Sequence, residues 1–123
     1  TLEDLPQRPL LKSVSQADAV FHLAGALSGS LKHMQQINGQ GTKNLAEMIL
    51  QSESRPVFLH LSSIAAAGPS APGEARCEST PPRPISEYGV SKLEGERAIA
   101  AYGQQLKLTI VRPGIVFGPG DKE

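Results

Sequence analysis

Three short apolar runs, at residues 19–23, 57–61 and 108–112, constrain the fold of this chain more than any other feature. Each run contains β-branched or aromatic residues and has the length of a buried strand. Pro113 follows the third run and cannot donate a ladder hydrogen bond, so it marks the end of that strand. The runs therefore predict three strands in the interior of a sheet.

Segments with helical periodicity separate these runs. Apolar residues recur three or four positions apart over 31–53 and 86–105, and a shorter helix before the first run turns Val14 inward. Alternating strands and helices predict an α/β fold, part of a doubly wound parallel sheet of about three strands with both faces covered. Residues 69–86 hold five of the ten prolines and interrupt this pattern as a long irregular loop.

The composition argues against several classes of protein. Twelve basic and twelve acidic residues cancel, so no general attraction to nucleic acid or to an anionic membrane is expected. The single cysteine, Cys77, excludes an internal disulfide framework. No apolar run approaches the roughly 18 residues of a membrane-spanning helix. We therefore expect a cytoplasmic protein that binds neither nucleic acid nor membrane.

Small or hydroxyl-bearing residues follow all three predicted strands. In an open parallel sheet, the carboxyl ends of the strands line the crevice in which ligands bind. The helix after the first strand adds Asn38, Gly39 and Gly41. Glycines there either admit a ligand close to the backbone or allow tight packing of the helix, and the whole set favours a ligand. The residues that follow the strands are Ala24, Gly25, Ala26, Ser62, Ser63, Pro113, Gly114 and Ile115.

Tyr88 and Lys92 lie one turn apart on the same face near the start of a predicted helix. Lowering the pKa of a phenol from about 10 to about 7 requires roughly 4 kcal/mol. An ammonium at about 5 Å supplies roughly 3 kcal/mol at an effective dielectric of about 20. With the Ser63 hydroxyl beside it, the phenol could exchange a proton with a substrate oxygen. The alternatives are a solvated helix face for the pair and a local backbone bond for Ser63.

Five segments resemble the successive motifs of the NAD-dependent epimerase/dehydratase family, in the extended short-chain dehydrogenase/reductase superfamily. They are DAVFHLAG at 18–25, NGQGTKNL at 38–45, FLHLSSIAAAG at 58–68, YGVSK at 88–92 and VRPGIVFGPGD at 111–121. The resemblance implies a Rossmann-type fold in which Tyr88 is the acid/base, Lys92 holds the nicotinamide ribose and Ser63 positions the substrate. The cofactor-binding residues implied by it are Ala24, Gly25, Ala26, Asn38, Ser62, Tyr88, Lys92, Pro113, Gly114 and Ile115.

The same resemblance implies hydride transfer with NAD or NADP at an alcohol or carbonyl carbon, by an epimerase, dehydratase or reductase. A nucleotide sugar is the commonest substrate of the family, and sterol-type alcohols are also used. Ala67 and Phe117 replace tyrosines of many members and leave the substrate class open. Residues 1–123 would be the C-terminal part of a dinucleotide-binding domain, without its glycine-rich start or a substrate domain. Thr1 to Asp4 would then be the remnant of an adenine-contacting loop. We expect the isolated segment to be inactive, and a homodimer of the full-length protein is left open.

Two other functions compete with this interpretation. A non-catalytic dinucleotide-binding or scaffold protein could keep the fold, although the intact Tyr88, Lys92 and Ser63 argue against it. A serine hydrolase built on Ser63 would need a G-x-S-x-G elbow and a supporting order of Asp and His, and the sequence has neither.

The remaining polar residues are expected to be structural. No Cys/His spacing suggests a metal site, and His22 and His60 should be buried among apolar neighbours. We interpret Cys77 as an incidental thiol in the proline-rich loop. Arg112 could pair with a carboxylate or shape the crevice. A solvated helix face is expected for Glu94, Glu96 and Arg97.

Overall fold

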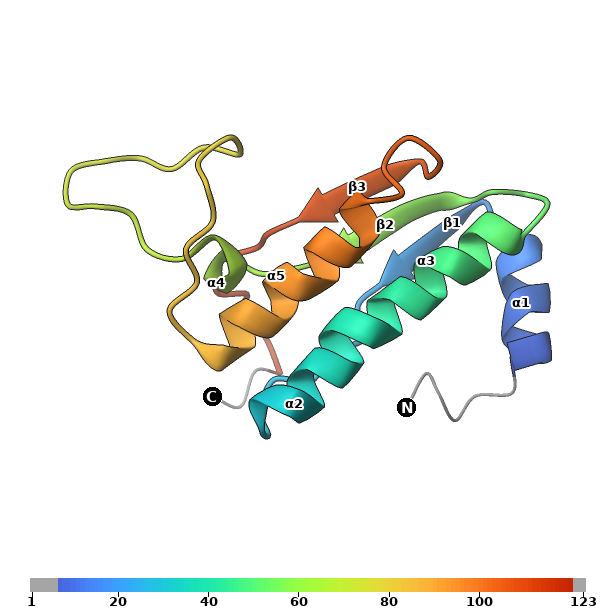
Figure 1. Ribbon diagram of the computed structural model, residues 1–123, viewed down its shortest axis with the longest axis horizontal. Coiled ribbons are helices and arrows are strands. Elements are labelled where there is room, and N and C mark those ends of the chain that lie inside the picture. Colours follow the sequence, from blue (N-terminus) through green and yellow to red (C-terminus); the bar gives the residue numbers. More distant parts are fainter. Residues whose placement is uncertain (1–6, 121–123) are drawn as a thin grey trace.

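The computed structural model describes residues 7–120 and contains a parallel sheet of three strands in the order β1-β2-β3 (Figure 1). The strands are β1 (Ala19–His22), β2 (Val57–Leu61) and β3 (Leu108–Val111). His22 pairs in register with His60, and His60 pairs with Ile110. The α/β fold predicted from the sequence is confirmed, and the first and third strands each end one residue earlier than predicted.

Six helical segments accompany the sheet within residues 7–120. The segment predicted as one helix over 31–53 changes its winding, because a π-helical stretch separates two α-helices. The helix predicted over 86–105 ends at Ala100 and continues as turns. A single turn after β2 was not predicted. The segments are α1 (Gln7–Ser15), α2 (Leu31–Met34), η1 (Gln35–Gly41), α3 (Thr42–Gln51), α4 (Ile64–Ala67) and α5 (Glu87–Ala100).

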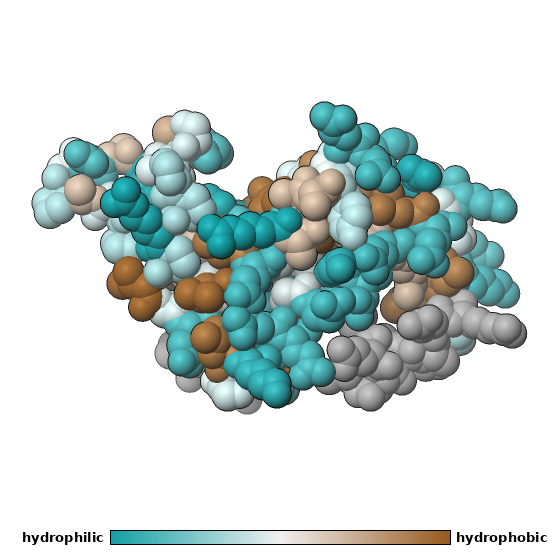
Figure 2. Space-filling model, viewed as in Figure 1, coloured by the Kyte–Doolittle hydropathy of each residue, from teal (hydrophilic) through white to brown (hydrophobic). Residues whose placement is uncertain are grey.

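The hydrophobic core lies between one face of the sheet and the helices α1, α3 and α5. Figure 1 shows α3 and α5 side by side over this face. Phe58, Ile49 and Ile99 are fully buried there, and Val14 joins them from α1 as the sequence predicted. The outer side of α3 and α5 is mostly hydrophilic (Figure 2), as expected for helices that bury only one stripe.

The other face of the sheet has no covering helix among residues 7–120, so the prediction of helices on both faces is wrong for this part of the chain. Phe21 is 64% exposed and Val57 is 43% exposed on that face. The strand order explains why. Since each strand is added on the same side of the previous one, right-handed crossovers bring both connecting helices to a single face.

Residues 69–86 contain no helix or strand, which agrees with the prediction of an irregular loop. In Figure 1 this loop, which connects α4 to α5, extends away from the sheet. It returns at Ser86, whose side chain accepts a hydrogen bond from the N–H of Gly89 at 3.0 Å and caps helix α5. The cap fixes where α5 begins, and therefore where Tyr88 and Lys92 lie relative to the sheet.

Candidate active site at the carboxyl ends of the strands

Lys92 is anchored at the end of β2. Its side chain is only 4% exposed, and its Nζ donates a hydrogen bond to the carbonyl of Leu61 at 2.7 Å. A Cβ atom added to Gly25 would lie 3.7 Å from the same nitrogen. The ammonium of Lys92 therefore lies against the segments that follow both β1 and β2. This corrects the alternative of a solvated helix face for Lys92.

The surroundings of Lys92 act on its charge in two directions. Burial lowers the pKa of Lys92, because a charged ammonium loses hydration there, and the negative charge of Glu96 raises it. Removing an ammonium from water has a free-energy cost that a structural role does not explain well. A buried lysine beside open sheet ends is a common feature of functional sites.

Tyr88 lies in the first turn of α5, and its side chain is half-buried. The next residue, Gly89, packs so closely on α4 that an added Cβ atom would lie 2.3 Å from the carbonyl oxygen of Ala65. The start of α5 is thus in contact with α4, the helix that begins directly after Ser63. Convergence of the phenol of Tyr88 on the hydroxyl of Ser63 stays a prediction.

Ser63 is the N-cap of α4. Its Oγ accepts a hydrogen bond from the backbone N–H of Ala65 at 3.1 Å, and its side chain is half-buried. This is the local backbone bond that the sequence allowed as an alternative. The bond uses a lone pair of the oxygen, so the O–H proton can still be donated to a substrate oxygen. The two roles of Ser63 are therefore compatible.

Asn38 joins the end of β1 to helix α5. It is 1% exposed, and its Nδ2 donates hydrogen bonds to the carbonyl of Ala26 and to the Oγ of Ser91, both at 2.9 Å. Ser91 in turn donates to the backbone carbonyl of Tyr88 at 2.7 Å. Asn38 thus supports both the glycine-alanine segment after β1 and the first turns of α5. Its predicted contact with a dinucleotide stays a prediction.

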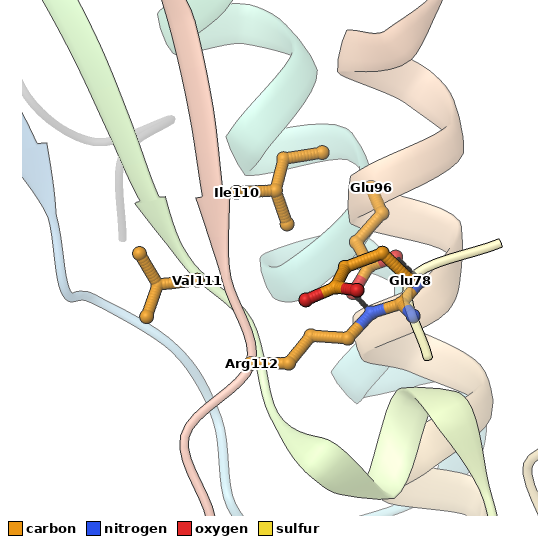
Figure 3. A pocket seen from close by; sticks show the side chains of 5 residues that line it. All are labelled: Glu78, Glu96, Ile110, Val111 and Arg112. Atoms are coloured by element: carbon orange, nitrogen blue, oxygen red, sulfur yellow. Dashed lines mark hydrogen bonds and ion pairs between the residues drawn. The ribbon is translucent and has the colours of Figure 1, made fainter. Parts of the chain in front are cut away.

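Glu96 was expected on a solvated face, and this expectation is wrong. Glu96 is 4% exposed and accepts hydrogen bonds from the Oγ of Ser62 and from the Nε of Arg112, the latter at 2.8 Å. Figure 3 shows the Arg112 side chain reaching Glu96 on α5. The carboxylate of Glu96, one helical turn after Lys92, is buried because Ser62 after β2 and Arg112 after β3 each donate hydrogen bonds to it. Arg112 therefore does pair with a carboxylate, one of the two roles that the sequence allowed.

The other two members of the expected solvated face differ from each other. Glu94 is half-buried and accepts a hydrogen bond from the Nε2 of Gln35 at 2.7 Å, which ties η1 to α5. Arg97 is exposed as predicted. Fewer charged residues of α5 are exposed to solvent than the sequence suggested.

The glycines of η1 and α5 allow close packing of the two helices. A Cβ atom added to Gly39 would meet the Cβ of Glu94 at 3.6 Å, an ordinary contact, which favours helix packing over a ligand at this position. Gly95 is more demanding, because an added Cβ atom would lie 2.3 Å from the carbonyl oxygen of Asn38. The packing role of Gly95 was not predicted from the sequence. A glycine three residues after the Lys of the Tyr-x-x-x-Lys pair was the available signal.

His22 and His60 are buried under the site, as predicted. Their rings stack with centroids 5.3 Å apart. Burial lowers the pKa of His22 to about 4 and that of His60 to about 3, with the charge of Lys92 as a second cause. Thr42 donates its hydroxyl proton to the carbonyl of Asn38, so its oxygen accepts from the Nε2 of His22 at 3.0 Å. Both nitrogens of His60 lack a hydrogen-bond partner among the described residues.

The end of β3 is open. A Cβ atom added to Gly114 would meet nothing within 4 Å, and Ile115 is 91% exposed. Pro113 accepts a hydrogen bond from the N–H of Ile64 at 2.9 Å, which joins this end to α4. Ala24 and Gly25 are exposed at the end of β1. Small residues at two strand ends thus leave room for a bound molecule beside Lys92.

Away from this edge, three features were considered: the cysteine, groups of metal ligands and membrane-spanning helices. Cys77 is exposed, and hydrogen bonds from Ser79 and Thr80 lower its thiol pKa to about 7. Within residues 7–120, no group of three or more His, Cys, Asp or Glu side chains gathers as metal ligands would. None of the helices described is long and apolar enough to cross a membrane.

Comparison with known proteins identifies the family. Residues 4–123 match the model of the NAD dependent epimerase/dehydratase family. This chain belongs to that family. The resemblance found in the five sequence motifs is thereby confirmed, while the residues proposed as a remnant of an adenine-contacting loop lie outside the described range.

Several members of the family are similar over most of this chain. The 3beta-hydroxysteroid-dehydrogenase/decarboxylase isoform 1 of Arabidopsis thaliana is 31% identical over 92% of the chain and 27% of its own length. The crystal structure of UDP-glucuronic acid 4-epimerase from Bacillus cereus in complex with NAD superposes with a TM-score of 0.83 and 27% identity, covering 97% of this chain and 38% of that one. RMD from Pseudomonas aeruginosa complexed with NADPH gives a TM-score of 0.76 and 32% identity, covering 85% and 39%. The chain spans 27% to 33% of the length of the curated relatives it matches.

Proposed function

We propose that this chain carries the catalytic residues of a nicotinamide-dependent oxidoreductase, epimerase or dehydratase that acts on an alcohol or carbonyl carbon. Tyr88 is the acid/base, Ser63 positions the substrate oxygen, and Lys92 supplies positive charge and holds the cofactor ribose. The observation that carries this proposal is the burial of Lys92, whose ammonium bonds to Leu61 at the carboxyl end of β2 and lies beside Gly25.

The acid/base role of Tyr88 requires stabilisation of its phenolate. A reduction of three pKa units corresponds to roughly 4 kcal/mol. An ammonium one helical turn away, at about 5 Å, contributes roughly 3 kcal/mol at an effective dielectric of about 20. Burial of Lys92 strengthens this effect, because less water screens its charge. The hydroxyl of Ser63 then donates to the substrate oxygen while Tyr88 exchanges the proton with it.

The open ends of β1 and β3 leave room for an extended cofactor. Ala24, Gly25 and Ala26 would line one side, and Pro113, Gly114 and Ile115 the other, with Asn38 and Ser62 supporting the segment between them. The cofactor, when bound, supplies or accepts the hydride. Both NAD and NADPH occur in similar structures. We therefore propose a nicotinamide dinucleotide and assign neither form.

The substrate class is proposed from relatives together with the site. One similar structure is of a UDP-glucuronic acid 4-epimerase, and one curated relative is named for a steroid substrate. Both substrates present a secondary alcohol or the matching carbonyl to the site. A nucleotide sugar is our first candidate. The alternative function is that of a non-catalytic member of the family. Cytoplasmic localisation and a homodimer remain expectations.

The test uses the full-length protein that contains this chain. Tyr88→Phe removes the phenolic proton and should lower turnover by a factor of about a hundred or more, with little change in dinucleotide affinity measured by fluorescence titration. Tyr102→Phe is the matched control, because the Tyr102 hydroxyl bonds to Glu47 on α3. Equal turnover in both variants would remove the acid/base role of Tyr88. A wild-type protein that binds dinucleotide without turning over any alcohol or carbonyl substrate would favour the non-catalytic alternative.

A further inference from the structure

Lys92 and Glu96 form an arrangement that should produce an ion pair. They lie four residues apart on α5, both are 4% exposed, and opposite charges at this spacing attract each other along a helix, more weakly with Lys before Glu than in the reverse order. Burial strengthens such an attraction. In the described part of the chain, however, no salt bridge joins them, and the Nζ of Lys92 donates to the carbonyl of Leu61 instead.

Arg112 and Ser62 hold the carboxylate of Glu96 instead. The guanidinium of Arg112 binds both carboxylate oxygens, through Nε to Oε1 and through its terminal nitrogen to Oε2. Ser62 donates a second hydrogen bond to Oε1. Two parallel bonds from a planar guanidinium to a carboxylate form a strong and directional pair. Oε1 thus accepts two of these bonds and Oε2 accepts one, so Arg112 and Ser62 together fix the orientation of the carboxylate.

The charges of this cluster do not cancel. Lys92 and Arg112 are cations, and Glu96 is the carboxylate that lies one helical turn from Lys92 and bonds to Arg112. Because Arg112 forms the two-bond pair, the positive charge of Lys92 remains without a bonded anion and faces Leu61 and Gly25. Arg112 directly follows β3, so a residue 20 positions after Lys92 in the sequence binds the carboxylate that lies one helical turn from Lys92.

We propose that Arg112 is a positioning residue, which holds the carboxylate of Glu96 away from Lys92 so that the ammonium stays directed at the strand ends. This inference rests on the proposed function of Tyr88 and Lys92. If Arg112 were absent, Lys92 would turn along α5 to Glu96. The positive charge available to the phenolate of Tyr88 and to a cofactor ribose would then be reduced.

Other charged groups near Lys92 do not offer a substitute anion. From the sheet, His22 and His60 face it, and burial keeps both neutral near pH 7. On α3, Lys43 and Glu47 pair with each other and are 42% exposed. The remaining ionisable groups on α5, on the elements packed against it or beside Glu96 are Lys32, His33, Glu78, Glu87 and Arg97, which are exposed, and Glu94, which bonds to Gln35.

The first test is Arg112→Met in the full-length protein. Turnover should fall about tenfold at neutral pH, and the limb of the pH–rate profile that reports Tyr88 should move up by about one pH unit. Arg97→Met is the matched control, because Arg97 is exposed on the same helix as Glu96. The control should keep the wild-type profile.

The second test distinguishes positioning from a merely structural role. Arg112→Met combined with Glu96→Gln removes the anion as well, and Gln can still accept from Ser62, so this double variant should regain the wild-type pH profile. Arg112→Lys, which keeps the charge without the two-bond geometry, should lie between wild type and Arg112→Met. A folded Arg112→Met variant with an unchanged profile would overturn the proposal, as would a folded double variant that keeps the shifted profile.

A third measurement needs no catalysis and separates this inference from the proposed function. The ultraviolet absorbance of the phenolate can be titrated in each Arg112 background, with and without Tyr88→Phe, and the difference gives the pKa of Tyr88. Arg112→Met should raise that pKa by about one unit, and the double variant should reverse the change. If Tyr88→Phe leaves turnover intact, the proposed function fails although this titration can still succeed. If the titration shows no difference between backgrounds, the positioning role of Arg112 fails.

Discussion

The side-chain oxygen of Asn38 accepts a hydrogen bond from the backbone N–H of Ala26 at 2.8 Å, and its amide nitrogen donates back to the carbonyl of the same residue at 2.9 Å. One buried side chain therefore satisfies both backbone groups of a residue that has just left the sheet. The same amide reaches Ser91 on α5. The small residues after β1 and the helix that carries Tyr88 are thus held together by a single residue.

Replacing this residue should destabilise the protein. Asn38→Ala would leave both backbone groups of the half-buried Ala26 without their partner, at a cost of about 2 kcal/mol in the free energy of unfolding. Chemical denaturation would measure it. Asn44→Ala is the control, since Asn44 bonds only to the exposed side chain of Gln40 and its loss should change stability by less than about 0.5 kcal/mol. Similar values for the two variants would contradict the bridging role of Asn38.

Two glycines of the helix pair should respond in opposite ways to the same substitution. Gly95→Ala would force a methyl group to within 2.3 Å of the carbonyl of Asn38, so we expect α5 to shift and the free energy of unfolding to fall by about 2 kcal/mol or more. Gly39→Ala places its methyl group in ordinary contact with Glu94 and should be neutral or stabilising by up to about 1 kcal/mol.

Dinucleotide affinity measured on Gly39→Ala also tests why this glycine is present. Unchanged affinity would agree with packing of η1 on α5. A large loss of affinity in a stable variant would instead restore the interpretation in which a ligand approaches the backbone there.

The buried ammonium of Lys92 should reduce stability while it serves function. Lys92→Met keeps the aliphatic stem and removes the buried charge, whose hydration is lost on folding, so the free energy of unfolding should stay equal or rise. Dinucleotide affinity should fall about tenfold and turnover about a hundredfold or more. Lys43→Met, on the exposed side of α3, should change neither affinity nor turnover. A Lys92→Met variant that is less stable but binds normally would show that this lysine is structural.

The stacked histidines should make the protein sensitive to acid. Their folded-state pKa values, about 4 for His22 and about 3 for His60, lie below the ordinary value of 6.5, so the unfolded chain binds more protons between these limits. The free energy of unfolding has its full value above about pH 6.5 and falls as the pH is lowered towards about 4 for His22 and about 3 for His60, by about 2 kcal/mol per histidine at about pH 5.

His60→Leu should remove about half of this dependence. It should not lower stability near pH 7, because both nitrogens of His60 lack partners among residues 7–120. The measurement is denaturant unfolding at several values between pH 7 and about 5, with His33→Leu on the exposed surface of α2 as the control. An unaltered pH dependence in His60→Leu would mean that this residue does not carry the acid sensitivity.

Local sequence patterns were sufficient for the elements and their order. Apolar runs located β2 to the residue and β1 and β3 to within one residue, because a strand buried on at least one face needs a continuous or alternating apolar pattern. The Ser before a helical segment and the proline-rich stretch before it also located the start of α5. These features depend on residues that are neighbours in the chain.

The burial and the bonding partners of the charged residues could not be predicted from such local patterns. Glu96 looked like any exposed helical glutamate, and only the fold showed that Arg112, just after β3, and Ser62, just after β2, reach it. The sequence by itself determined three parallel strands, the small residues after them, and a tyrosine-lysine pair at the start of a helix, since each of these is a local pattern. The tertiary structure decided which charges are buried, which partners they bind and which face of the sheet is covered, because these depend on contacts between segments that are distant in the sequence.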